Sequence, residues 1–205
     1  MSIDKQSPEH YFSIDPKSKF IISSFSTILR GHDFMFSTSS SVFSKKRIDS
    51  GTRLLVEKMI LPEEGTLLDL GCGYGAIGIV AASTNQKLQV FMTDVNSRAV
   101  ALSRINIKKN RIINAKVRRG YLYEPVEGLI FNCILLNPPV SAGMDLVKKM
   151  VLGAPKVLAN GGSFQMVIRS KIGKKSFPLI FNEVFGNCTI ISRGSGYRIL
   201  KGEII

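Results

Sequence analysis

The stretch Thr66-Leu-Leu-Asp-Leu-Gly-Cys-Gly-Tyr-Gly-Ala-Ile-Gly78 decides the fold. Its apolar start predicts a buried strand over 66–70, its glycines predict a tight turn, and the small apolar residues after them predict a helix over 75–83. A turn of this kind places backbone N–H groups and a helix N-terminus beside a ligand. The stretch therefore predicts a ligand site in a nucleotide-type α/β fold.

Two cofactors compete for this turn. Gly73-Tyr-Gly-Ala-Ile-Gly78 matches the G-x-G-x-x-G pattern of dinucleotide sites. The strand before it, however, ends in Asp69, and the tightest glycine triplet is Gly71, Gly73 and Gly75. A carboxylate at the turn would repel a pyrophosphate, whereas it suits the sulfonium and ammonium groups of S-adenosylmethionine (SAM). We favour SAM over a dinucleotide, and a glycine turn without a ligand is the remaining alternative.

A second acidic residue supports a nucleotide-type site. Asp94 ends the next apolar run, Leu88–Asp94. It lies about 20 residues after the glycines, where a ribose-binding carboxylate belongs in this kind of fold. We therefore expect Asp94 to bind the ribose hydroxyls of the cofactor.

The composition is that of a basic globular protein. The 205 residues suit one domain with an extension, which we place at 51–205 and 1–50. No apolar run reaches the roughly 18 residues of a membrane span, and the first residues lack the layout of a signal peptide. Cys72, Cys133 and Cys188 are too widely spaced for a disulfide framework or a zinc site, so we expect free thiols in a cytoplasmic protein without a metal.

The net charge is +13, with a pI of about 9.9. A balance this basic favours a polyanionic partner, most simply nucleic acid. The alternative is a basic surface that only aids solubility.

The rest of the chain alternates between strand and helix. A turn signal at Arg30-Gly-His-Asp33 predicts an N-terminal β-hairpin, and a helix starts at Asp49 or Ser50 and ends before Pro62. The order predicts a mostly parallel sheet with one antiparallel strand near its end. The further strands are expected at 88–93, 115–119, 131–136, 163–168, 189–192 and 197–200, and the further helices at 96–109, 143–158 (kinked or restarted at Pro155) and 173–184.

The motif Asn137-Pro-Pro-Val140 follows the strand 131–136, at the end where open α/β sheets bind ligands. The prolines fix the backbone, so the Asn137 amide oxygen and the Pro138 carbonyl become rigid acceptors, and Pro139 has no N–H to compete for them. Two fixed acceptors suit a planar amine with two N–H donors, whose lone pair they aim at a methyl carbon without a strong base. A turn that merely ends the strand is the alternative.

Together these motifs resemble class I SAM-dependent methyltransferases of the "methyltransferase small" domain family, which includes small-subunit ribosomal RNA guanine-N2 methyltransferases and single-domain archaeal relatives. The resemblance runs from His10 to the C-terminus, and its most specific part is Val42-Phe-Ser44 with Asp49-Ser-Gly-Thr52. It implies a Rossmann-like seven-stranded sheet, SAM as the methyl donor and an amine of RNA as the acceptor.

The resemblance also implies roles for single residues. Asn137, Pro138 and Pro139 would be catalytic, while the Phe43–Ser44 loop and Thr52 would close over the pocket. The implied cofactor contacts are Asp69, Gly71, Cys72, Gly73, Gly75, Asp94, Val95, Tyr121, Leu122 and Asn137. The implied substrate contacts are Phe43, Lys45, Lys46, Arg47, Val140 and Lys171.

Two positions depart from the family pattern. Tyr121 stands where an acidic residue usually contacts the adenine amine, so adenine would stack on an aromatic ring or bond a backbone carbonyl near Tyr121 and Leu122. Val140 stands where nucleic-acid enzymes of this kind often carry an aromatic residue that stacks on the flipped base. Phe43 or another aromatic residue would have to supply that stacking.

The leading expectation is a cytoplasmic, monomeric RNA methyltransferase that forms N2-methylguanine in ribosomal RNA, acting on rRNA or the small ribosomal subunit. The alternatives are a protein glutamine methyltransferase and a non-catalytic module that binds SAM or RNA. Basic clusters at 45–47 and 171–175 lie beside motif-bearing loops and are candidates for phosphate contacts, whereas those at 108–111 and 118–119 are as readily a solvated face.

Overall fold

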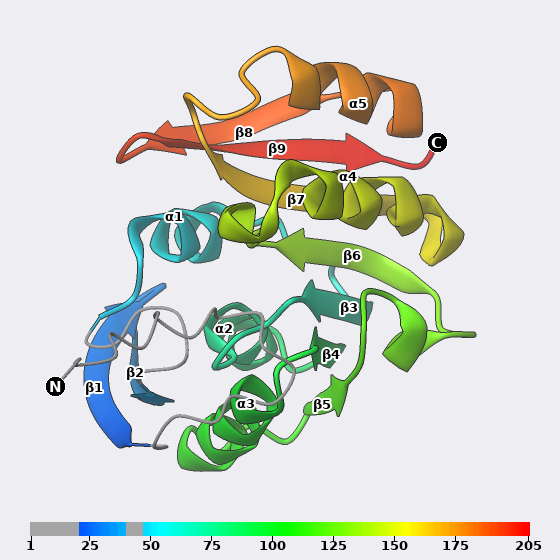
Figure 1. Cartoon of the computed structure of the whole chain (residues 1–205). Helices are drawn as coiled ribbons and strands as arrows, with labels where there is room; N and C mark the ends of the chain where they lie inside the picture. Colours follow the sequence, from blue (N-terminus) through cyan, green and yellow to red (C-terminus); the bar gives the residue numbers. More distant parts are fainter. Residues whose placement is uncertain (1–20, 40–46) are drawn as a thin grey trace, which may run out of the picture.

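The computed structural model describes residues 21–39 and 47–205 (Figure 1). In chain order the elements are β1 (Ile22–Leu29), β2 (His32–Ser39), α1 (Ser50–Lys58), β3 (Gly65–Leu70), α2 (Ala76–Thr84), β4 (Leu88–Asp94), α3 (Ser97–Lys109), β5 (Ala115–Arg119), η1 (Glu124–Val126), β6 (Phe131–Leu136), η2 (Val140–Ala142), α4 (Met144–Gly153), η3 (Ala154–Lys156), β7 (Leu158–Arg169), α5 (Ser176–Phe185), β8 (Thr189–Gly194) and β9 (Tyr197–Glu203), where η marks a single 3-10 turn.

Among the described residues, seven strands form one sheet in the order β5-β4-β3-β6-β7-β9-β8. The strands from β5 to β7 are parallel, and β9 runs antiparallel to both of its neighbours. Two of the predictions, the Rossmann-like α/β class and the single antiparallel strand, are thereby confirmed. Because the chain runs outward from β3 to β5 and then returns to place β6 on the other side of β3, the carboxyl ends of β3 and β6 flank a crevice.

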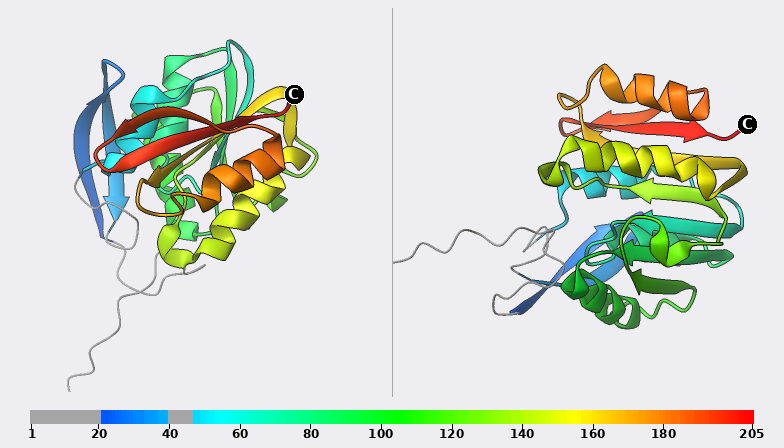
Figure 2. Two further views of the ribbon diagram at one scale, coloured as in Figure 1. Left: turned by 90° about the horizontal axis from the view of Figure 1, so that it is seen from above. Right: turned by 45° about the vertical axis from the view of Figure 1, so that its right-hand side comes forward.

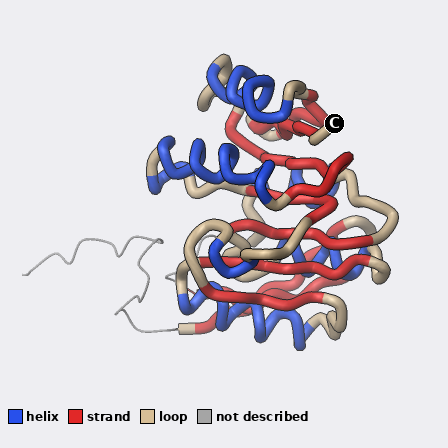
Figure 3. The backbone as a smooth tube through the Cα atoms, turned by 90° about the vertical axis from the view of Figure 1, so that its right-hand side faces the viewer, coloured by secondary structure: helices blue, strands red, loops and turns tan. Residues whose placement is uncertain are grey.

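The sheet is covered on both faces. Strand side chains alternate between two buried clusters: Leu67 and Leu135 belong to the cluster with α1, α2 and α3, whereas Leu68 and Leu136 belong to the cluster with α4 and α5. Figure 2 shows α4 and α5 on one side of β9 and α1 on the other, and Figure 3 shows the same layers from the side. Burial on both faces explains why these strands are almost continuously apolar.

Two elements begin at clearly different residues from those predicted. β7 begins at Leu158 rather than at residue 163, because Asn160–Gly162 forms an irregularity inside the strand: Phe131 pairs with Leu158, but Cys133 pairs with Ser163. α5 begins at Ser176 rather than at 173. The predicted end of the first helix before Pro62 is confirmed, since α1 ends at Lys58. The predicted break at Pro155 is confirmed, since α4 ends at Gly153 and η3 contains the proline.

The predicted hairpin is confirmed and forms a separate two-stranded sheet of β1 and β2. A buried amide anchors it: Asn106 Nδ2 donates to the carbonyls of Ser37 (2.9 Å) and Tyr74 (2.8 Å), and Asn106 Oδ1 accepts from Ser37 N (2.7 Å). The Tyr74 ring also contacts the rings of Phe36 and Phe25. The hairpin is thus linked to the glycine turn after β3 through the Asn106 side chain and through the packing of Tyr74.

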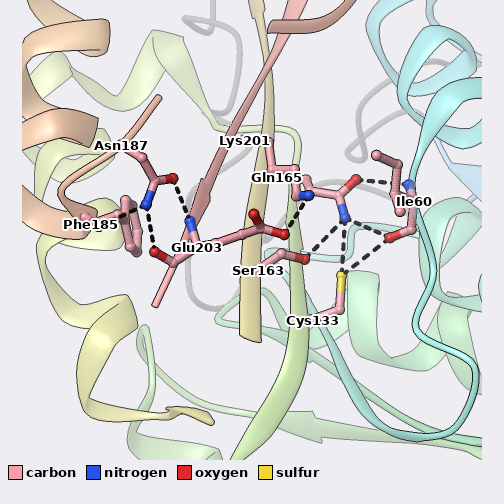
Figure 4. A network of polar contacts seen from close by, with 8 residues as sticks. All are labelled: Ile60, Cys133, Ser163, Gln165, Phe185, Asn187, Lys201 and Glu203. Atoms are coloured by element: carbon pink, nitrogen blue, oxygen red, sulfur yellow. Dashed lines mark hydrogen bonds and ion pairs between the residues drawn. The ribbon is translucent and has the colours of Figure 1, made fainter. Parts of the chain in front are cut away.

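A second buried amide fixes the segment that follows α1 (Figure 4). Gln165 of β7 donates to the Ile60 carbonyl (2.6 Å) and accepts from Ile60 N (2.9 Å). Its Nε2 also lies 3.2 Å from Ser163 Oγ and 3.4 Å from Cys133 Sγ. Because both backbone groups of Ile60 are bonded to the sheet, the end of α1 is held over β6 and β7.

In the part of the chain that the structure describes, no helix is long and apolar enough to cross a membrane. Within the same residues, no three His, Cys, Asp or Glu side chains are grouped so that they could hold a metal ion. Cys72, Cys133 and Cys188 are free thiols.

Candidate active site

A cavity of about 450 Å³ opens at the carboxyl ends of β3, β4 and β6. This size and position are those of a small-molecule site in an open α/β sheet. Its lining comes from the start of α1 (Asp49, Thr52), the turn after β3 (Leu70–Tyr74, Ala76, Ile77), the end of β4 (Thr93–Val95), the loop after β5 (Gly120–Leu122), the loop after β6 (Asn137–Ser141), α4 (Leu146, Met150), the end of β7 (Val167–Arg169, Ile172) and the start of β9 (Tyr197).

The glycines of the turn have two different tasks. Gly71 (φ +70°) and Gly73 (φ +59°) line the cavity in the left-handed region that favours glycine. Gly75 (φ +94°) caps α2 behind the lining, and a Cβ there would lie 2.6 Å from Met92 Cε and 3.0 Å from Ser103 Oγ. Gly75, predicted to contact the cofactor, is not among the described residues that line the cavity. Its lack of a side chain instead lets α2 approach β4 and α3.

Cys72 lines the cavity between these glycines. Its backbone N–H donates to the Thr93 carbonyl (2.8 Å), and its thiol lies 3.6 Å from Ser103 Oγ. Burial, together with the charges of Asp69 and Asp94, raises the pKa of the Cys72 thiol well above its usual value. The thiol is therefore a packing group at neutral pH, and not a nucleophile.

Asp69 lies beneath the turn rather than among the described residues that line the cavity. Its Oδ2 accepts from Gly78 N in the first turn of α2 (2.8 Å), and its Oδ1 has no partner among the described residues. Burial raises the pKa of Asp69 to about 7, the hydrogen bond from Gly78 opposes this rise, and the charge of Asp94 adds to it. A cation in the cavity would favour the ionised form of Asp69.

Asp94 is held rigidly at the edge of the cavity. Its Oδ2 accepts from Gly73 N and its Oδ1 accepts from Asn96 N, both at 2.9 Å. Asn96 itself caps α3, which follows. Carboxylate oxygens can each accept more than one hydrogen bond, so a residue of this kind at this position fits the ribose hydroxyls of SAM.

The loop after β5 forms a wall of the cavity on the side of Asp94 and the glycine turn, which we call the cofactor half. Tyr121 and Leu122 line the cavity as expected, with Leu122 at φ +48° and Tyr121 O accepting from Glu124 N (3.1 Å). Leu122 packs in the cluster that contains Met150, which also lines the cavity. A mainly apolar wall suits the face of an adenine ring, in place of the acidic contact that is missing at Tyr121.

The side of the cavity that would hold the methyl acceptor, which we call the acceptor half, is built around Asn137. Its Nδ2 donates to Thr52 Oγ1 (2.8 Å) and lies 3.3 Å from Asp49 Oδ1. Both partners accept, so the amide turns its Oδ1 away from them and toward the cavity. Asp49 was expected at the start of the helix and within the family-specific segment, but it was given no role at the site. It does accept from Thr52 N (2.9 Å) as the cap of α1.

The Pro138 carbonyl has one neighbour that the sequence prediction missed. Val140 N donates to Pro138 O (2.9 Å) across Pro139, whose φ of −76° and ψ of 74° are those of an inverse γ-turn. Pro139 has no N–H, as expected, but the N–H of Val140 does compete for this carbonyl. One lone pair of the Pro138 oxygen remains for a substrate donor.

The predicted substrate residues are scattered. Val140 lines the cavity, whereas Arg47 and Lys171 are exposed and are not among the described residues that line it. Phe43, Lys45 and Lys46 lie outside the described residues. The structure instead adds Arg169, Ile172 and Tyr197, which come from β7, the segment after it and β9. All three lie within the stretch that resembles the family, but the resemblance assigns none of them a role.

The strand order, with β9 antiparallel between β7 and β8, is that of class I SAM-dependent methyltransferases, and Asn137 and Pro138 line the same cavity as the glycine turn. The model of the methyltransferase small domain matches residues 33–201, and the chain belongs to this family. It is thus a SAM-dependent methyltransferase, and the dinucleotide interpretation of the glycines is wrong.

The chain is 39% identical over 197 residues to the uncharacterized protein YbxB of Bacillus subtilis, covering 95% of this chain and 98% of that protein. It is 28% identical to Ribosomal RNA small subunit methyltransferase C of Hamiltonella defensa over 84% of this chain, and it spans about half (51%) of that relative's length. Its fold matches the 16S rRNA N2 methyltransferase RsmC of T. thermophilus, solved with AdoMet and guanosine, with a TM-score of 0.82 and 24% identity over 93% of this chain and 52% of that one.

Proposed function

We propose that this chain methylates an exocyclic amine of RNA, with guanine N2 of ribosomal RNA as the first candidate, in the cytoplasm. The observation that carries the proposal is the Asn137 amide, whose nitrogen is engaged by Thr52 and Asp49 so that its oxygen faces the cavity. The names of two relatives, an rRNA small subunit methyltransferase and an rRNA N2 methyltransferase solved with guanosine, support the choice of acceptor.

The chemistry follows from positions rather than from a base. SAM supplies an electrophilic methyl group on its sulfonium. Asn137 Oδ1 and the remaining lone pair of Pro138 O each accept one N–H of the amine, which turns the nitrogen lone pair toward the methyl carbon. As the nitrogen gains positive charge, both carbonyl dipoles stabilise it. The Asp49 carboxylate, 3.3 Å from Asn137 Nδ2, polarises the amide and makes its oxygen a better acceptor.

The surface beside the acceptor half suits a polyanion. Arg169, Lys171, Lys174 and Lys175 follow one another closely at the end of β7 and after it, and Arg169 lines the cavity itself. With a net charge of +13, this segment is the first candidate for phosphate contacts. Binding to RNA through these side chains weakens as the salt concentration rises.

The test is methyl transfer from labelled SAM to rRNA isolated from cells that lack this protein. Label should appear in the RNase-sensitive fraction as N2-methylguanosine. Asn137→Ala should lower the rate roughly 100- to 1,000-fold while SAM still binds, because one of two transition-state acceptors is lost. Asn182→Ala, at an exposed position on α5, is the matched control and should leave the rate unchanged.

The other outcomes each point elsewhere. Protease-sensitive label would indicate methylation of a protein amide, such as a glutamine side chain, whose nitrogen also offers two donors. Tight SAM binding without transfer to any fraction would indicate a non-catalytic module. Transfer that survives Asn137→Ala would contradict the proposed mechanism.

A further inference from the structure

The acceptor half of the cavity lacks an aromatic side chain at the position after Asn-Pro-Pro, which is Val140. A base that enters the cavity without stacking would lose the contact that usually compensates for leaving an RNA stack. Three tyrosines line the cavity among the described residues: Tyr74, Tyr121 and Tyr197. Their positions decide which of them can replace the missing ring.

Two of these three tyrosines lie where they cannot replace the missing ring. Tyr74 is buried, and its ring packs edge-on against Phe25 and Phe36 of the hairpin. Tyr121 follows β5, in the loop beside Asp94, and so belongs to the cofactor half. Tyr197 alone, within the described residues, is an aromatic residue on the acceptor side.

Contacts link Tyr197 to the groups that orient Asn137. A Cβ built on Gly51 would lie 2.9 Å from Tyr197 Cε1, so the ring packs directly on this glycine. Gly51 stands in the first turn of α1 between Asp49 and Thr52, the two residues bonded to the Asn137 amide. The absence of a side chain at Gly51 is what admits the ring there.

A cation accompanies the ring. Arg169 pairs with Tyr197 across β7 and β9, and its guanidinium carbon lies 5.5 Å from the centre of the tyrosine ring. Both side chains line the cavity, Tyr197 is partly buried, and Arg169 is exposed. A planar ring and a planar guanidinium at one cavity mouth offer a base both a stacking surface and a hydrogen-bonding fork.

We propose that Tyr197 and Arg169 form the binding site for the target base: the base stacks on the Tyr197 ring while the Arg169 guanidinium donates to its O6 and N7 atoms. Guanine alone among the RNA bases offers these two acceptors on one edge and an exocyclic amine, N2, on the opposite edge, where Asn137 and Pro138 receive it. Adenine presents an N6 amine to the arginine instead of an acceptor. This inference rests on the proposed function and names the residues that make it specific for guanine.

The first test uses fluorescence. The chain contains no tryptophan, so Tyr197→Trp introduces the sole indole at the site. With S-adenosylhomocysteine present at a constant saturating concentration, guanosine should quench this fluorescence in a saturable titration, and adenosine should do so more weakly. Leu179→Trp, on the exposed side of α5, is the matched control and should not respond.

The second test is enzymatic. Tyr197→Phe should keep kcat/KM for RNA within about 2-fold, whereas Tyr197→Ala should lower it roughly 10- to 100-fold, because one base–aromatic stack is lost, with unchanged SAM affinity. Adding Val140→Phe to Tyr197→Ala should restore part of the activity by returning a ring to the usual position, which a merely structural role of Tyr197 would not allow. Arg169→Ala should reduce the preference for guanosine over 2-aminopurine riboside, which keeps the 2-amino group and N7 but lacks O6.

The outcomes separate this inference from the proposed function. If the wild-type protein methylates RNA, but guanosine does not quench the indole of the Tyr197→Trp variant and Tyr197→Ala keeps full kcat/KM, the base site is wrong and the function stands. If guanosine quenches that indole but no RNA is methylated, the base site is supported and the proposed function fails. Loss of both signals contradicts both.

Discussion

Thr52→Val removes one of the two acceptors that orient the Asn137 amide while preserving the shape of the side chain. The bond from Asn137 Nδ2 to Thr52 Oγ1 is 2.8 Å long and neutral, so it contributes about 1 kcal/mol to the orientation of the amide. If that orientation is needed only in the transition state, the loss corresponds to roughly a 5-fold fall in kcat. Thr52→Ser, which keeps the acceptor, should retain the wild-type rate.

The second acceptor is charged and gives a larger effect in combination. Asp49 Oδ1 lies 3.3 Å from Asn137 Nδ2, and Asp49→Asn keeps a good helix cap while removing the charge. The double variant Asp49→Asn with Thr52→Val should lose on the order of 2 kcal/mol, or roughly 30-fold in kcat, because only a neutral amide oxygen at position 49 then orients the Asn137 amide.

The assay is single-turnover methyl transfer at saturating SAM and RNA, with SAM affinity measured separately by calorimetry. The decisive comparison is a double-mutant cycle: in an Asn137→Ala background, Thr52→Val should have no further effect, because Thr52 acts through the Asn137 amide. An equal fall in both backgrounds, or a fall in SAM affinity that accounts for the loss, would refute the reasoning.

Burial raises the pKa of Asp69 from 3.8 to about 7. Between these pH values the folded protein keeps a proton on Asp69 that the unfolded chain loses. The free energy of unfolding should therefore fall by an amount on the order of 4 kcal/mol as the pH rises from about 4 to about 7. Urea titrations across this range should show that Asp69→Asn removes the dependence, and an unchanged slope would contradict the assignment. Gln165→Leu leaves both backbone groups of Ile60 without their sheet partner and should cost about 2–4 kcal/mol in urea unfolding, whereas Gln89→Leu, at an exposed position on β4, should change it by less than about 0.5 kcal/mol. Asp94→Asn cannot accept from two backbone N–H groups through both side-chain atoms and should weaken SAM binding roughly 10- to 100-fold by calorimetry; undiminished affinity would exclude Asp94 as a cofactor contact.

The sequence was most informative where chemistry is local. The glycine turn after β3, the carboxylate at the end of β4 and the Asn-Pro-Pro corner after β6 each depend on a few consecutive residues, and the structure brings the cavity-lining members of all three together. Alternating apolar strands and amphipathic helices predicted the parallel sheet, and a parallel sheet necessarily gathers the carboxyl ends of its strands at one edge. The cofactor class therefore followed from the sequence alone.

The boundaries that failed depend on pairing between distant residues. Asn160–Gly162 has the local pattern of a turn, yet β7 continues through it because Leu158 already pairs with β6 and because Gly161 and Gly162 bond to Ile204, just after β9. Asp69 and Gly75 were predicted as ligand contacts because they belong to the glycine-turn motif, but neither is among the described residues that line the cavity: Asp69 accepts from Gly78 N, and Gly75 packs against Met92 and Ser103.

What the sequence determined by itself was thus the fold class, the methyl donor and the presence of an Asn-Pro-Pro corner after β6, because each depends on local patterns of residues. Only the tertiary structure decided how that corner is oriented and what faces it. Asp49 and Thr52 come from the start of α1, and Tyr197 comes from the last strand, 60 positions after Asn137. These side chains meet because β9 inserts next to β7 and α1 packs across β7 to β9, and no spacing along the chain encodes that proximity.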